Sequence, residues 1–191
     1  MKREPRKRML AHLTSLEADT VHRHSLAVAK RLAGIAQFQV AKCVSTYVSM
    51  GPEIETHNII RQLLATGRLV CVPAFHDGKY VAAAIEDFDR DLVAGKLGIL
   101  EPKHLRPVPV TRPDVWLLPG LAFDRNGNRL GRGKGYFDAL LQHAPGVKIA
   151  LTHNFQLLPE VPSEPHDVRM DFIITENQVV QCTRNHEPNC Y

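Results

Sequence analysis

The chain has 191 residues, 44% hydrophobic and 23% charged, and this length suits one sizeable domain with its own core. Its 12 glycines and 13 prolines are too few for a collagen-like or low-complexity chain. No apolar run approaches the ~20 residues of a membrane span, so no membrane partner is expected. The basic N-terminus lacks a following apolar segment, which argues against a secretory signal. A mitochondrial leader stays open, because such leaders are also rich in arginine.

The net charge of +4 comes from one short segment. Residues 1–8 hold five basic side chains and one acid, whereas basic and acidic groups balance over the rest of the chain. Such a segment is either a solvated helix end or an arm that binds phosphate. The four cysteines include no Cys-x-x-Cys pair, so we expect free thiols in a reducing compartment, the cytoplasm.

Helix and strand signals alternate along the first half of the chain. The first 40 residues are predicted to be helical, with Ser15 capping a segment that ends near Ala33. The apolar run 43–48 predicts a strand, and Thr56 should cap a helix that runs to about residue 65. Two further strands are expected, over residues 69–73 and 80–85.

The second half repeats this alternation. Its expected elements are a proline-rich connection over 101–114, a strand over 115–119, a glycine-rich loop over 120–135, a helix over 136–144, a strand over 148–152, a long loop over 153–170 and final strands over 172–175 and 179–182. Strand–helix–strand units favour an α/β fold, with a mainly parallel central sheet and helices on both faces. We expect a single domain over residues 1–183 and a frayed tail over 184–191.

The loop after the strand at 115–119 carries the strongest functional signal, because open parallel sheets bind ligands beyond the carboxyl ends of their strands. Gly131, Gly133 and Gly135 alternate there with Arg132 and Lys134, just before a predicted helix. Glycines let backbone N–H groups approach an anion, and the helix start and the cations add positive charge. Neither a Walker A loop nor a Rossmann fingerprint fits the spacing. The alternative is a flexible surface turn with solvated cations, but the pattern favours a phosphate site.

Two aspartates are candidate metal ligands. Asp138 begins the helix after the glycine-rich loop, where an aspartate is also favoured by the helix dipole alone. Mg²⁺ commonly takes one or two carboxylates together with phosphate oxygens, and Asp167 is a candidate second ligand. The ten histidines, by contrast, include no His-x-x-x-His motif. His22 and His24 would diverge on a helix, and we interpret the histidines as surface or structural groups.

One decapeptide resembles a known family. Arg129-Leu-Gly-Arg-Gly-Lys-Gly-Tyr-Phe-Asp138, preceded by Leu118-Pro-Gly-Leu-Ala-Phe-Asp124, is similar to the corresponding segment of 5-formyltetrahydrofolate cyclo-ligases. Weaker matches occur in the family order, at Lys2-x-x-x-Arg6, around Glu53, and in the segments 98–102 and 165–175.

The resemblance implies a reaction and its cofactors. A cyclo-ligase closes 5-formyltetrahydrofolate to 5,10-methenyltetrahydrofolate, using ATP and Mg²⁺ and releasing ADP and phosphate through a phosphorylated formyl group. The residue chemistry suits this, because phosphoryl transfer depends mostly on neutralising and positioning charge.

The resemblance also implies roles for individual residues. ATP would be bound by Lys2, Arg6, Arg129, Leu130, Gly131, Arg132, Gly133, Lys134, Gly135, Tyr136 and Phe137. The folate, with or without a polyglutamate tail, would be bound by Arg6, Glu53, Arg132, Gly133, Lys134, Gly135 and Tyr136. Arg132 and Lys134 would be catalytic, and Asp138 and Asp167 would hold the metal.

Two other readings stay open. A sugar-phosphate isomerase-like enzyme would use a similar sheet without ATP and without the basic arm. An RNA-binding module could use the arm, but the neutral body and the 6% aromatic content offer little stacking surface. We therefore expect no nucleic-acid partner and a monomeric enzyme.

Overall fold

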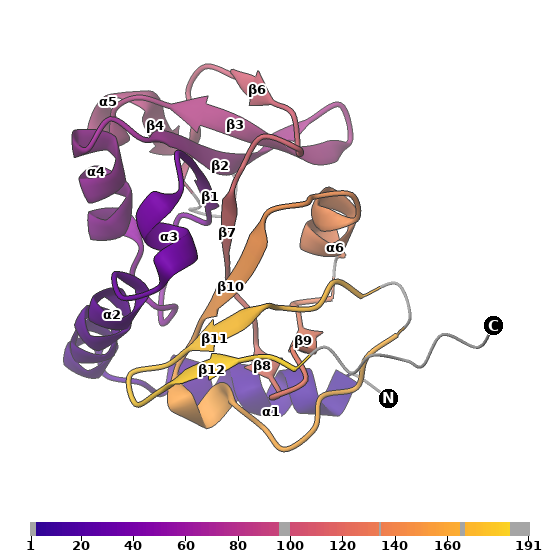
Figure 1. Cartoon of the computed structure of the whole chain (residues 1–191). Helices are drawn as coiled ribbons and strands as arrows, with labels where there is room; N and C mark the ends of the chain where they lie inside the picture. The colour runs from indigo at the N-terminus through magenta and orange to yellow at the C-terminus, as the bar shows by residue number, and fades with distance from the viewer. Residues whose placement is uncertain (1–2, 96–99, 134, 165–166, 184–191) are drawn as a thin grey trace.

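Residues 3–95, 100–133, 135–164 and 167–183 are described by the computed structural model of the chain. Their main feature is an eight-stranded sheet in the order β12-β11-β10-β7-β1-β2-β3-β6 (Figure 1). These strands span Cys43–Thr46 (β1), Leu69–His76 (β2), Lys79–Ile85 (β3), Pro107–Val108 (β6), Val115–Leu118 (β7), Val147–Leu151 (β10), Phe172–Ile174 (β11) and Val179–Gln181 (β12). The strands from β11 to β2 are parallel, whereas β12, β3 and β6 pair antiparallel. The mainly parallel α/β domain expected from the sequence is therefore confirmed.

The central strands are buried because helices cover both of their faces. Every residue of β1 and β7 is buried, and Val115 of β7 lies opposite Val44 of β1 and Val147 of β10. A strand buried on both faces reads as a continuous apolar run rather than an alternating one. The sequence of β7 is such a run, whereas β1 also buries Ser45 and Thr46.

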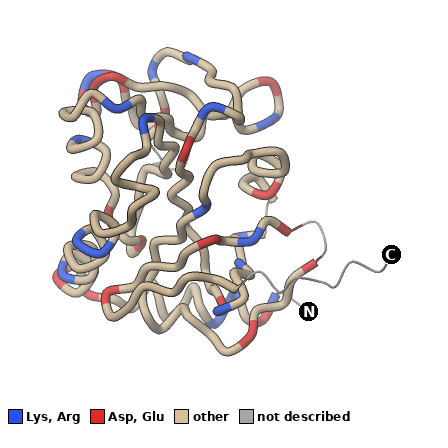
Figure 2. Tube along the Cα trace, in the orientation of Figure 1, with Lys and Arg blue, Asp and Glu red and all other residues tan. Residues whose placement is uncertain are grey.

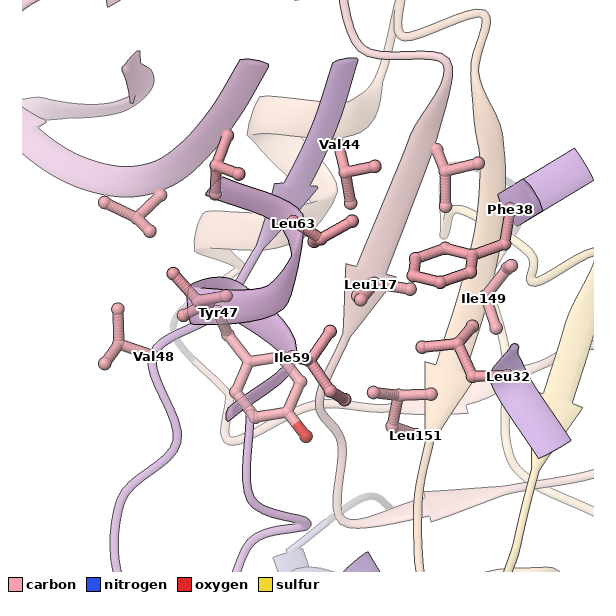
Figure 3. Close-up of a cluster of buried hydrophobic side chains, with 14 of the residues drawn as sticks. Leu32, Phe38, Val44, Tyr47, Val48, Ile59, Leu63, Leu117, Ile149 and Leu151 are labelled. Atoms are coloured by element: carbon pink, nitrogen blue, oxygen red, sulfur yellow. The ribbon is translucent and has the colours of Figure 1, made fainter. Parts of the chain in front are cut away.

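The helices span Arg3–Thr14 (α1), Ala18–Leu32 (α2), Ala36–Val40 (α3), His57–Ala65 (α4), Phe88–Asp91 (α5) and Tyr136–Leu141 (α6). Helices α2, α3 and α4 cover one face of the sheet, and α6 packs on the other (Figure 1). In the core between these three helices and the sheet, Leu32, Phe38 and Leu63 pack with Leu117 and Ile149 (Figure 3). Among the described residues, no helix is long and apolar enough to cross a membrane.

Several predicted boundaries differ from the structure. Ser15 does not cap α2, because its hydroxyl donates to the His12 carbonyl at 2.8 Å and so closes α1 instead; Glu17 precedes α2. Thr56 does precede α4, but its hydroxyl donates to the Tyr47 carbonyl rather than capping the helix. Helix α6 ends at Leu141, earlier than expected.

Two predicted irregular segments contain short strands. The proline-rich connection contributes β5 (Leu100–Pro102), which pairs with β4 (Leu92–Ala94), and β6 at the sheet edge. The glycine-rich loop contains a hairpin of β8 (Ala122–Phe123) and β9 (Arg129–Leu130). Cys43 and Cys71 are free and buried, as expected, whereas Cys190 and the rest of the tail lie outside the described residues.

Candidate functional site

The carboxyl ends of the parallel strands bring four loops to one edge of the sheet. The loop after β1 carries Glu53, the loop after β7 carries the glycine-rich segment, and the chain after β10 and β11 carries His153 and Glu176. Helix α1 lies across this edge beside β8 and β9 (Figure 1), where Met9 and Leu13 pack on the hairpin. The edge is thus the place where sequence reasoning expected a ligand.

A buried carboxylate organises the hairpin that precedes the glycine-rich segment. Asp124 is fully buried, and its Oδ1 accepts the backbone N–H groups of Asn126 and Asn128 at 3.0 and 3.1 Å. Its Oδ2 accepts the side-chain amide of Asn128 at 2.9 Å and the backbone N–H of Val161 at 2.9 Å. These bonds fix the turn between β8 and β9, and with it the direction in which the chain leaves β9. Sequence reasoning did not single out Asp124.

Arg129 and Asp138 form an ion pair across the base of the loop. The Arg129 Nη2 donates to the Asp138 Oδ1 at 2.8 Å, and only 4% of the arginine side chain is exposed. Within the described part of the chain, the buried Arg129 Nε–H has no hydrogen-bond acceptor. A Cβ on Gly131 would lie 3.2 Å from the Arg129 Nη1, so the missing side chain leaves the guanidinium space.

The glycines that follow adopt conformations that side chains disfavour. Gly133 has φ +99° and Gly135 has φ +65°, both in the left-handed region. Arg6 of α1 rests against this segment, where its Nε–H donates to the Gly131 carbonyl at 3.0 Å. A Cβ on Gly133 would lie 3.3 Å from the Arg6 guanidinium carbon. The basic arm and the glycine-rich segment are therefore in direct contact.

The arm is a helix whose basic residues differ in environment. Arg6 is partly buried on the loop, whereas Arg3, Lys7 and Arg8 are exposed. The two readings of the arm thus apply to different residues: a solvated helix surface for the exposed ones, and a loop contact for Arg6. Elsewhere basic and acidic residues are interspersed (Figure 2), in keeping with the neutral body. The proposed ligands Lys2 and Lys134 lie outside the described residues.

An ion pair joins the glycine-rich segment to Glu53. The Arg132 Nη2 donates to the Glu53 Oε1 at 2.8 Å, and the Glu53 Oε2 accepts the Met50 N–H at 3.1 Å. The Glu53 side chain is 14% exposed and that of Arg132 is 50% exposed. Together with Tyr47, Pro119 and other groups they line a small cavity at the sheet edge. The structure thus brings together two residues that the family resemblance assigned to the folate.

The remaining predicted site residues take different positions. The Leu130 side chain is buried in the α1–hairpin core, so only its backbone can face a ligand. The Tyr136 ring is exposed, and its centroid lies 4.6 Å from the centroid of the Tyr80 ring of β3. Phe137 packs against the same core cluster as Val168. The Oδ2 of Asp167, next to Val168, accepts the Glu164 N–H at 2.8 Å.

A cavity of about 460 Å³ lies between α6 and the β3–β6 edge, close to Tyr80. Val81, Val108 and Leu140 give it an apolar lining, and Lys79 and His143 add polar groups. Among the described residues, no predicted site residue lines it. Sequence reasoning missed this cavity because its walls come from three elements without a shared motif.

Comparisons with known proteins agree with this architecture. The family model for the 5-formyltetrahydrofolate cyclo-ligase family matches residues 1–176. The 5-formyltetrahydrofolate cyclo-ligase of Mus musculus is 30% identical over 190 residues, covering 92% of this chain and 94% of its own. That of Mycolicibacterium smegmatis is 34% identical over 158 residues, covering 75% and 78%. The NMR structure of the Aquifex aeolicus 5,10-methenyltetrahydrofolate synthetase has a TM-score of 0.86 at 27% identity, and covers 100% of this chain and 99% of that one. The chain therefore belongs to the 5-formyltetrahydrofolate cyclo-ligase family and is a ligase of folate one-carbon metabolism.

Proposed function

We propose that this chain closes 5-formyltetrahydrofolate to 5,10-methenyltetrahydrofolate with ATP, through a phosphorylated formyl group. The formyl oxygen attacks the γ-phosphorus, ADP leaves, and an imidate phosphate forms. N10 then bonds to the formyl carbon, loses its proton, and phosphate leaves. We further propose that the enzyme acts as a cytoplasmic monomer.

The contact between Arg132 and Glu53 is the observation that carries this proposal. The reaction needs the formyl oxygen and the γ-phosphorus within bonding reach, so the folate and nucleotide sites must adjoin. The carboxylate of Glu53 suits the N–H donors of a pterin ring, since an ionised carboxylate is an acceptor only. Arg132 uses one of its five N–H donors on Glu53 and keeps others for phosphate oxygens. Arg132 would then link the folate site, through Glu53, to the phosphates of the nucleotide.

The other loop residues would neutralise and hold the phosphates. The guanidinium of Arg6, beside Gly131 and Gly133, and the Lys134 side chain add positive charge along the segment. The backbone N–H groups of the glycines are the donors that a phosphate can approach most closely. Preorganised charge of this kind costs no reorganisation when the phosphoryl group transfers.

The donor set of Asp138 and Asp167 fits Mg²⁺. Carboxylate oxygens are hard ligands, and Mg²⁺ typically combines one or two of them with phosphate oxygens. The ion pair with Arg129 uses the Asp138 Oδ1, and Oδ2 is the second oxygen that Asp138 can offer. Bound there, Mg²⁺ would neutralise phosphate charge and orient the γ-phosphoryl group. Arg129 would then hold Asp138 in place rather than only contact the nucleotide.

The test is the growth of the methenyl-folate absorbance when the protein is mixed with 5-formyltetrahydrofolate, Mg²⁺ and ATP. We expect the signal only with all three present. Glu53→Gln should raise the KM for the folate about tenfold, and the KM for ATP much less, since an amide replaces one acceptor by a donor. Glu55→Gln is the matched control, because Glu55 lies two residues away and pairs with His22 instead. ATP-independent turnover, or equal effects of the two substitutions, would refute the proposal.

A further inference from the structure

A second polar cluster lies at the same sheet edge, outside the loop and the two aspartates. His24 of α2, His153 after β10 and Glu176 after β11 place their side chains together. The His24 Nδ1 and His153 Nδ1 are 2.9 Å apart, and the Glu176 Oε1 is 3.8 Å from the His24 Nδ1. His153 is fully buried, and the other two side chains are 21% and 14% exposed.

From this cluster we infer a binding site for a transition-metal ion of the zinc class, held by His24, His153 and Glu176. Two imidazoles and one carboxylate form a ligand set that zinc and its neighbours prefer and that Mg²⁺ does not. The site is therefore chemically distinct from one built of Asp138 and Asp167. Nothing in the cyclisation chemistry calls for it.

The distances are close to those around one shared ion. Ligand nitrogens about 2.05 Å from a tetrahedral ion are about 3.4 Å apart, so the two Nδ1 atoms, now 2.9 Å apart, would separate by about half an ångström to share one ion. All three candidate ligand atoms lie within 4.8 Å of one another. Atoms bound to one tetrahedral ion of this class are about 3.4 Å apart, so the Glu176 carboxylate would have to move inward by roughly 1 Å.

Two of the three ligands are already oriented by outer partners. The His153 Nε2 lies 2.9 Å from the Pro52 carbonyl, so this nitrogen carries the proton and the Nδ1 keeps its lone pair. The Glu176 Oε2 accepts the Asn154 N–H at 2.8 Å, which leaves Oε1 toward the histidines. A metal-ligating histidine typically donates its other N–H to a carbonyl or carboxylate in this manner.

The protonation state of His153 also suits metal binding. Burial lowers the pKa of this imidazole, outweighing the Pro52 contact, which acts in the opposite direction. Ligating histidines must be neutral, so the ring needs no deprotonation at neutral pH. A hydrogen bond between the two rings alone would explain the 2.9 Å contact, but not the position of the Glu176 Oε1 at 3.8 Å from the same His24 nitrogen.

An ion here would tie three parts of the chain together beside the substrate edge. It would hold α2, the end of β10 and the turn after β11, and His153 in turn contacts the residue that precedes Glu53. We expect such an ion to stabilise the fold. At Zn²⁺ about 100-fold above its Kd, the midpoint of thermal unfolding should rise by roughly 5–10 °C.

Cobalt is the probe for this site. The full chain is stripped with a chelator, kept in excess Mg²⁺ to saturate the oxygen site, and titrated with Co²⁺ while its visible absorption is recorded. We expect one Co²⁺ per chain and visible d–d bands. The His153 Nε2–H proton, held by Pro52, should also shift through the paramagnetic ion. A wild-type protein that binds no Co²⁺ under these conditions, or shows no such shift, would overturn the proposal.

Variants locate the ion. His24→Gln keeps a donor for the His153 Nδ1, and Glu176→Gln keeps an acceptor for the Asn154 N–H, so both are designed to fold. Each should weaken Co²⁺ binding at least tenfold. His22→Gln is the matched control on the same helix, because His22 pairs with Glu55 and should leave Co²⁺ binding unchanged. If both His24→Gln and Glu176→Gln bind Co²⁺ with wild-type affinity, the proposed site is wrong. If either variant fails to fold, the shift of the His153 Nε2–H proton in the wild-type protein tests the site instead.

Discussion

The two halves of the loop between β7 and α6 differ sharply, although they are continuous in sequence. Residues 121–124 and 129–130 are buried, and the turn between them is hydrogen-bonded to the Asp124 carboxylate. Arg132, Gly133 and Gly135, by contrast, are exposed. The first half is held in place by the Asp124 carboxylate and by the core beneath α1. The second half exposes a charged side chain and glycine backbone. We therefore expect stability and ligand binding to be separable within this single loop.

The largest effect is expected from removing the carboxylate that organises the first half. Asp124→Ala leaves three backbone N–H groups without their acceptor, at about 1–3 kcal/mol for each buried group, less what water recovers. We expect a loss of about 3–5 kcal/mol in the free energy of unfolding, measured by urea denaturation. Asn126→Ala, at an exposed position in the same turn, should stay within about 0.5 kcal/mol of the parent. A stable Asp124→Ala protein would show that the hairpin does not depend on its carboxylate.

Lys134→Ala should show the opposite behaviour. If Lys134 neutralises the transferring phosphoryl group, its removal should lower kcat about 10²–10³-fold, the usual cost of one electrostatic donor. The free energy of unfolding should change little. Arg125→Ala removes an equal charge from the first half, where Arg125 contacts Gln178, and should leave kcat unchanged. Steady-state kinetics by methenyl absorbance decides this, and wild-type turnover in Lys134→Ala would contradict its catalytic role.

The two proposed metal ligands should differ in how much they contribute to stability. Asp138→Asn should both weaken Mg²⁺ activation about tenfold or more and lower stability by ~1–3 kcal/mol, because the buried Arg129 loses its charge partner while an amide oxygen remains. Asp167→Asn should weaken Mg²⁺ activation with less loss of stability. The double variant should be little worse than the worse single one, since both residues serve one ion. Independent, additive effects on the Mg²⁺ dependence would argue against a shared ion.

The sequence predicted the parts of the molecule that have local signals. The strand-forming segments at β1, β7 and β10 predict buried parallel strands, and the alternation of glycine with Arg132 and Lys134 predicts the phosphate-binding loop. The two-residue strands β8 and β9 have no period to detect, and they depend on a carboxylate whose partners include a residue far along the chain, Val161. Such structure is set by tertiary contacts.

The candidate sites show the same limit. Arg129 reads as one more phosphate-binding cation, but only the fold reveals that it is buried against Asp138. Direct contact between Arg129 and a nucleotide stays a prediction. His24 and His153 are 129 positions apart, and no spacing rule could pair them. The contacts of Arg132 with Glu53 and of Arg6 with Gly131 likewise join residues that are far apart in the sequence.

The smallest effect, and the finest test of the comparison, concerns the arm. Arg6 and Lys7 are adjacent on α1 and carry the same charge, but among the described contacts of these two residues only that of Arg6 reaches the loop, at the Gly131 carbonyl. Arg6→Ala should raise the KM for ATP about 5- to 10-fold, corresponding to a partly exposed charged hydrogen bond of ~1–1.4 kcal/mol. Lys7→Ala should change it less than twofold at physiological salt, because an exposed charge is largely screened. Deleting residues 1–8 should resemble Arg6→Ala and leave the fold intact, since Met9 and Leu13 still pack on the hairpin. Equal effects of Arg6→Ala and Lys7→Ala would mean that the arm acts through its net charge alone, and that its contact with the loop does not contribute to binding.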